Sequence, residues 1–254
     1  MRLLLLLTLT TVFFMAGCKH SRKEFAKQPG IDVFFETISI QKERGNCAGE
    51  KGSCAQVLMR FPLAKKGDPA LVRAINDTLL TYLIQQLTLK NPAGPPTLAQ
   101  LNTAAEAYLS EWRETNRSMA GIWQFTAEGK VVMQTAKVAV VYISIRSCSG
   151  GTMPGTSTAA FNFDLKTGKT LRLDDFITQV PSLRNLLEHK WGKSNLGTPW
   201  SAAMPAFSFV SGCYGLQLDG IHFWPENNHC PARGNPLILS YEELGPLVRR
   251  EKIF

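Results

Sequence analysis

The sequence predicts an α+β protein, with antiparallel sheets that carry helices packed on one face and with two intertwined subdomains. Three observations lead to this class. Several short segments alternate apolar and polar residues, which is the period of half-buried strands. Two segments in the first half instead repeat apolar residues every three to four positions, which is the period of a helix. Strands precede and follow these helices, and no internal repeat or phosphate-binding glycine motif is found.

The first 17 residues predict a lipoprotein signal peptide that lies outside the fold. Arg2 gives a positive start, and the apolar run from Leu3 to Phe14 is too short to span a bilayer. The run ends in Met-Ala-Gly-Cys, which is similar to the cleavage motif of bacterial lipoproteins and makes Cys18 the expected lipidation site. An ordinary signal peptide or an uncleaved anchor are the alternatives.

A lipidated Cys18 would attach the protein to a membrane of the cell envelope through acyl chains. Residues 18–30 then form a tether. An Asp directly after the lipidated cysteine would resemble an inner-membrane retention signal, but this position is Lys19. The periplasmic side of the outer membrane is therefore favoured. Loss of Arg2 lowers the formal net charge from +8 to +7. Outside the tether the cations are scattered, and without a basic-aromatic module nucleic acid is not an expected partner.

The cysteine count is informative because an exported protein can form disulfides. Six cysteines are present, and five remain for pairing if Cys18 carries lipid. Cys148 would then be the cysteine that keeps its thiol, although a disulfide between Cys148 and either Cys213 or Cys230 remains open. The candidate pairs are Cys47 with Cys54, around a short Gly-rich loop, and Cys213 with Cys230.

The first half predicts a strand hairpin followed by two helices. Residues 31–43 and 55–64 are the expected strands, joined by the loop between the first cysteine pair. Asp68 and Pro69 suit the N-cap and first position of a helix over 69–90, which lacks a cationic polar face and is therefore expected to pack on the core. Thr97 can cap a second helix, from Leu98 to about Asn116.

The second half predicts mostly strands. Residues 121–128 form one, and 130–148 hold at least one more with a break near Thr135. Residues 158–165 and 170–176 are expected to pair as a hairpin, with Gly168 at positive φ in the turn. The apolar side chains expected on one face of that hairpin are Phe161, Phe163, Leu165, Leu171 and Leu173. A helix over about 181–191, strands at 206–210, 214–225 and 236–241, and a closing helical turn capped by Ser240 complete the chain.

This second half resembles the RsiV-type C-terminal domain family of bacterial envelope proteins. The resemblance rests on "FNFDLKTGKTLRLDDF", "GLQLDGIHFW" and "LILSYEELGPLV", and it spans about residues 120–254. The helices before it, with "AINDTLL", resemble the smaller domain that precedes it in that family. The resemblance implies two domains, at 31–119 and 120–254, and an extracytoplasmic binding module rather than an enzyme. The family's role implies a lysozyme-type hydrolase as partner, with peptidoglycan as another ligand.

The candidate binding loop follows the central strands. In the family this loop usually reads Tyr-Thr-Gly-Gly-Ala-His, whereas here Cys148 enters the loop and Met153 stands in place of the histidine. The loop is therefore where this chain departs from the family it resembles. Its candidate residues are Cys148, Gly150, Gly151 and Met153.

No catalytic residue, metal or cofactor is expected. Asp174 and Asp175 are adjacent, so in a strand they would point to opposite faces, and Cys148 with scattered histidines matches no nucleophile signature. The spacing of His222, His229 and Cys230 matches no zinc pattern. A non-catalytic binding module is therefore favoured, with a cell-wall enzyme or a structural lipoprotein as alternatives. Binding a basic lysozyme would need an acidic patch, for instance Asp174, Asp175, Asp219, Glu226, Glu242 and Glu243.

Overall fold

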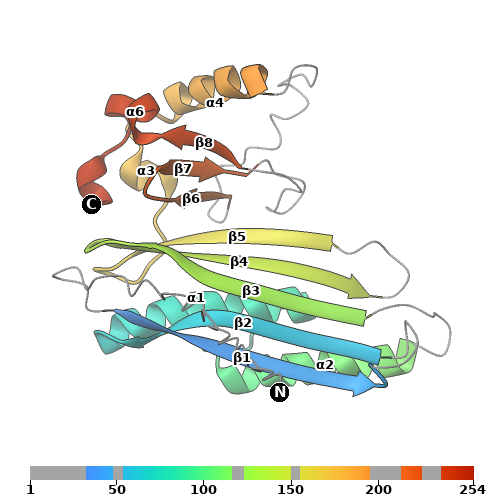
Figure 1. Ribbon diagram of the computed structural model, residues 1–254. Helices are drawn as coiled ribbons and strands as arrows, with labels where there is room; N and C mark the ends of the chain where they lie inside the picture. Colours follow the sequence, from blue (N-terminus) through green and yellow to red (C-terminus); the bar gives the residue numbers. More distant parts are fainter. Residues whose placement is uncertain (1–32, 48–53, 116–122, 150–154, 195–212, 225–235) are drawn as a thin grey trace, which may run out of the picture.

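The computed structural model describes residues 33–47, 54–115, 123–149, 155–194, 213–224 and 236–254. The fold is α+β, with a five-stranded and a three-stranded sheet (Figure 1). The strands are β1 (Phe34–Gly45), β2 (Cys54–Lys66), β3 (Trp123–Gln134), β4 (Val138–Ser149), β5 (Gly155–Asp164), β6 (Tyr214–Leu216), β7 (Gly220–Phe223) and β8 (Leu237–Ser240). The helices are α1 (Pro69–Thr88), α2 (Leu98–Thr115), α3 (Leu173–Phe176), α4 (Val180–Ser194), α6 (Tyr241–Leu244) and the 3₁₀ turns η2 (Gly245–Leu247) and η3 (Arg250–Lys252).

The larger sheet has the order β1-β2-β3-β4-β5, and all neighbouring pairs in it are antiparallel except β2 with β3. Parallel neighbours need a crossover connection, and α1 and α2 lie in that connection. The prediction of antiparallel sheets therefore holds apart from this one pair. The parallel pair also joins segments from both sides of residue 120 in a single sheet.

The two long helices form as predicted and pack on one face of the larger sheet (Figure 1). The carboxylate of Asp68 accepts hydrogen bonds from the backbone N–H groups of Ala70 and Leu71 at 2.9 and 3.0 Å, which caps α1. The leucine stripe of α1 is buried. The side-chain amide of Asn76 bonds both backbone groups of Ala64 in β2, at 2.8 and 2.9 Å, and so fixes α1 to the sheet.

The smaller sheet and the remaining helices form a second core on the opposite face of β3, β4 and β5. On β4, Val141 and Ile143 face the first core while Val140 and Tyr142 face the second. A strand buried on both faces needs apolar residues at almost every position, and this accounts for the continuous apolar run in β4. Helix α4 agrees with the predicted helix near 181–191.

The predicted hairpin over 158–165 and 170–176 is wrong in its second arm. The turn is correct, since Gly168 has φ of 72°, but past it Phe163 and Thr170 form an isolated bridge and residues 173–176 are helix α3. The carboxylate of Asp175 accepts from the N–H of Arg172 at 2.6 Å and starts this helix. Leu173 therefore enters the second core whereas Phe163 lies in the first, so they share no face.

Three smaller features complete the comparison with the sequence. Strand β3 continues past the predicted end at Glu128 to Gln134, and the break near Thr135 is confirmed because its hydroxyl accepts from the N–H groups of Lys137 and Val138. The 214–225 segment divides into β6 and β7, and the predicted strand at 206–210 lies outside the described residues. Ser240 caps α6 as predicted. Among the described helices, none is long and apolar enough to cross a membrane.

Candidate functional site

The larger sheet has a region that neither the helices nor the smaller sheet covers. The helices occupy one face, and the second core covers the opposite face only toward the end marked by Val140, Tyr142 and Ala160. Because side chains alternate along a strand, the rest of that face presents every second residue of all five strands. We call this region the open face; it consists of Ser39, Gln41, Gln56, Leu58, Arg60, Gln124, Thr126, Glu128, Ser144, Arg146, Thr156 and Thr158.

Strand pairing arranges the open face in rows that cross the sheet. One row is Ser39-Arg60-Glu128-Ser144-Thr158, and the next is Gln41-Leu58-Thr126-Arg146-Thr156. Since neighbouring strands lie about 4.8 Å apart, each row of five spans roughly 19 Å. The rows therefore form a broad surface of amide, hydroxyl and charged groups rather than a pocket.

The polar groups of the open face are largely unused by the fold. Among the described residues, one hydrogen bond lies within the face: the hydroxyls of Ser144 and Thr158 are 3.0 Å apart. The side chains of Gln56, Gln124 and Arg146 make no hydrogen bond or ion pair within the described part of the chain. A solvated face is common in antiparallel sheets, but unpaired amides and guanidinium groups in aligned rows are also what a polar partner requires.

The candidate binding loop begins at the edge of this face. Cys148 stands in a third row with Glu43, Gln56 and Gln124, at the end of β4. Its side chain is half-buried and carries a thiol. The other loop candidates, Gly150, Gly151 and Met153, lie outside the described residues.

The stem of the loop is fixed to α2 through Tyr108. The Tyr108 hydroxyl donates to the carbonyl oxygen of Cys148 at 3.0 Å, and its ring packs against Trp123 and Phe125 at centroid distances of 5.6 and 6.0 Å. Burial raises the pKa of Tyr108 above its usual range, so the phenol stays a neutral donor. The start of the loop is therefore held on a rigid base.

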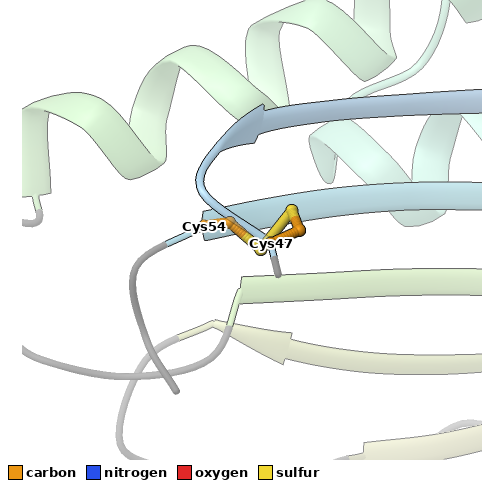
Figure 2. The surroundings of a disulfide bond; sticks show 2 residues. All are labelled: Cys47 and Cys54. Carbon is orange, nitrogen blue, oxygen red and sulfur yellow. A yellow bond between two sulfur atoms is a disulfide. The ribbon is translucent and has the colours of Figure 1, made fainter. Parts of the chain in front are cut away.

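Two disulfides bear on the sequence predictions. Cys47 is bonded to Cys54 at the turn between β1 and β2, as the spacing predicted (Figure 2). This bond lies at the same end of the sheet as Cys148, because Gly45 pairs with Cys54 and the start of β3 pairs with the end of β4. Cys213 is also disulfide-bonded, while Cys230 and the lipidation candidate Cys18 lie outside the described residues.

A polar chain that the sequence did not reveal runs through the second core. His222 is 7 % exposed; its Nε2 lies 3.0 Å from Asp219 Oδ1, and its Nδ1 lies 3.2 Å from the amide nitrogen of Gln217. The same amide nitrogen donates to the Tyr142 hydroxyl at 3.0 Å. Because a side-chain amide nitrogen only donates, His222 Nδ1 accepts and Nε2–H donates to Asp219. These hydrogen bonds connect the β6–β7 turn to β4.

This arrangement separates Cys148 from His222. Tyr142, which closes the polar chain, stands six residues before Cys148 on β4, a separation of about 20 Å along the strand. The structure therefore does not bring this cysteine and this histidine together. Among the described residues, no group of three potential metal ligands is found.

Two of the acids proposed for an acidic patch have cationic partners. Asp174 lies 3.1 Å from the Arg172 guanidinium, and Glu243 lies 2.6 Å from Lys190. The hydrogen bond from Lys190 and then the N–H of Ser240 lower the pKa of Glu243. Glu226 lies outside the described residues. Asp174 and Glu243 are therefore compensated locally, whereas Glu242 is exposed and makes no hydrogen bond or ion pair among the described residues.

Comparison with solved structures shows the fold. A DUF3298 family protein from Bacteroides fragilis superposes with a TM-score of 0.62 and 18 % identity, covering 85 % of this chain and 93 % of its own. A DUF3298 family protein from Pseudomonas aeruginosa gives a TM-score of 0.57 and 18 % identity, covering 87 % and 97 %. No protein-family model and no curated protein matches the sequence. The α+β fold is therefore shared with these two proteins.

Proposed function

We propose that the protein is a non-catalytic binding module of the bacterial cell envelope, and that the open face with the adjoining Cys148 loop is its binding surface. The observation that carries the proposal is the set of aligned polar side chains across five strands, most of which make no hydrogen bond within the described residues. The sequence supports export and a lipid anchor at Cys18, on the periplasmic side of the outer membrane.

The shape of the surface favours a protein as ligand. Small-molecule sites are concave, whereas the open face is a sheet surface with two arginines, one glutamate and several amides and hydroxyls. Polar, hydrogen-bonding surfaces of this kind are typical of the rim of protein interfaces. The RsiV-like resemblance of residues 120–254 points to a lysozyme-type hydrolase, and peptidoglycan, with its amide and hydroxyl groups, is the second candidate. A cell-wall enzyme and a structural lipoprotein of an envelope complex remain the alternatives to a binding module.

A binding assay with matched variants tests the proposal. Full-length protein in detergent is incubated with lysozymes and, separately, with isolated peptidoglycan, and bound protein is measured. The double variant Gln56→Ala with Gln124→Ala should lose binding by at least about tenfold, because it removes two hydrogen-bonding amides from the open face without changing the net charge of the protein. The control, Gln86→Ala with Asn185→Ala, removes two amides at exposed positions of α1 and α4, outside the open face, and should bind normally.

The outcomes separate the alternatives. Binding to neither ligand would refute the proposal in its specific form, and equal binding by both double variants would remove the open face from it. Turnover of muropeptides by the wild-type protein, lost on changing one acid or histidine, would establish an enzyme instead.

A further inference from the structure

A hollow lies away from the open face, beside the segment that leads from β5 to α3. It encloses about 880 Å³, which is within the range of small-molecule sites. Four parts of the chain that are distant in sequence form its walls: the start of α1 at Asp68, the β3–β4 turn at Lys137, the turn from Asp164 to Arg172, and η3 at Glu251. We call this hollow the cleft.

The cleft carries more cationic groups than the fold uses. The ammonium of Lys137 donates to the carbonyl oxygen of Glu251, and the guanidinium of Arg172 is bonded to Asp174. Lys166, Lys169 and Lys252 also line the cleft and are exposed, and within the described part of the chain their ammonium groups have no ion pair or hydrogen bond. These three groups are available to a carboxylate or another anion.

Most of the acids in the cleft are already engaged, with one exception. Asp68 caps α1, both oxygens of Asp164 accept from the turn that follows it, and Asp175 accepts from the N–H of Arg172. The carboxylate of Glu251 is exposed and has no hydrogen bond or ion pair within the described residues. The cleft therefore has one carboxylate, that of Glu251, and three lysine ammonium groups that are available to a ligand.

The turn that presents two of these lysines is held in place. Gly168, with φ of 72°, lies against α1 so closely that a Cβ there would be 2.8 Å from Ala74 Cβ and 3.0 Å from the carbonyl oxygen of Leu71. Lys166 and Lys169 stand on either side of this glycine. Their backbone is thus fixed before any ligand arrives, which reduces the entropy lost on binding.

We propose that the cleft binds a short zwitterionic peptide, whose carboxylate meets Lys166 and Lys169 and whose ammonium meets Glu251. Five cations and four acids line the cleft, so a polyanion or a bare cation would face strong repulsion from one set of charges, whereas a ligand with one charge of each sign satisfies both. Leu71, Val138 and Leu165 supply apolar wall between the charged groups. The cleft shares no residue with the open face, and the proposal does not depend on the function given above.

Three peptides and three variants test the pairing of charges. Binding of trialanine, trialanine amide and N-acetyl-trialanine to the full-length protein in detergent is measured by calorimetry. Trialanine should bind at least about tenfold more tightly than either blocked peptide, since each blocked peptide lacks one of the two terminal charges. Lys166→Gln with Lys169→Gln should abolish the preference for the free carboxylate and keep the preference for the free ammonium. Glu251→Gln should do the reverse.

A control variant removes two positive charges outside the cleft. Arg73→Gln with Lys90→Gln removes the same two charges outside the cleft and should leave all three affinities unchanged. Because every substituted side chain is exposed, circular dichroism is expected to show folded protein for each variant. Equal affinity for the three peptides, or no saturable binding of trialanine at millimolar concentration, would overturn the proposal. Tighter binding of inorganic phosphate than of trialanine would overturn it in favour of an anion site.

Discussion

Asn162 is expected to be the residue on which the attachment of the smaller sheet to the larger one depends most. It is 2 % exposed on β5. Its amide nitrogen donates to the carbonyl oxygen of Tyr214 at 2.9 Å, and its amide oxygen accepts from the N–H of Leu216 at 2.8 Å. One side chain thus bonds β6 as a neighbouring strand would, and Asn162→Ala leaves both backbone groups buried without partners.

The magnitude follows from these two contacts. Each buried backbone group that loses its partner costs about 1–3 kcal/mol, so Asn162→Ala should lower the free energy of unfolding by about 2–6 kcal/mol. Against a total stability of about 5–15 kcal/mol for a typical protein, this is a large fraction. Asn162→Asp keeps the acceptor for Leu216 but turns a carboxylate toward the Tyr214 carbonyl, so it should cost at least as much at neutral pH. Its cost should shrink in acid, where the protonated carboxyl can donate again.

Urea unfolding followed by far-UV circular dichroism measures the effect. The matched control is Asn185→Ala, which removes the same amide from an exposed position of α4 and should change the free energy of unfolding by less than about 0.5 kcal/mol. A loss below about 1 kcal/mol for Asn162→Ala would refute the reasoning, because it would mean that the two β6 groups find other partners. A separate early transition would show that the smaller sheet unfolds alone.

Three further predictions concern the turns and termini. Gly168→Ala should destabilise the protein by more than Gly94→Ala. Both glycines have positive φ, but a Cβ at Gly168 would press against α1, whereas nothing lies within 4 Å of a Cβ at Gly94. Thermal unfolding of the two variants measures the difference. Lys190 lowers the pKa of Glu243, so the ionised form adds stability above the unfolded pKa near 4.3, and this is lost as pH falls through the lower folded pKa. Glu243→Gln should therefore cost about 0.5–1 kcal/mol at pH 7, a small value because the pair is partly exposed, and flatten the pH dependence in acid. Replacing the Cys47–Cys54 pair by serines should cost up to about 2.5 kcal/mol, the loop entropy of a separation of 7 residues.

Each of these has an outcome that would contradict it. Equal losses for the two glycine variants would show that the contact with α1 yields easily. An unchanged acid limb in the Glu243 variant would remove the ion pair as a source of pH dependence. Unaltered stability of the serine variant would mean that the turn is as ordered without its disulfide as with it.

The sequence by itself determined the features that depend on a few neighbouring residues. Asp68 and Pro69 start α1, Gly168 makes the turn after β5, and Ser240 caps α6, as their local chemistry predicted. The spacing of Cys47 and Cys54 likewise predicted their bond. Capping, positive φ and short loop closure act within one turn of chain, so composition and spacing contain the information needed.

Only the tertiary structure decided what lies against each face. The alternation of side chains along β5 does not tell whether the second face of the strand contacts water or another sheet. The sequence therefore did not predict that Phe163 and Leu173 lie in two separate cores. The open face was hidden for the same reason, because its existence depends on where the smaller sheet ends. The parallel β2–β3 pair and the cleft at Glu251 bring together residues far apart along the chain. Such contacts follow from packing whole layers, and side-chain periodicity, which reports burial but not the identity of the neighbour, does not specify them.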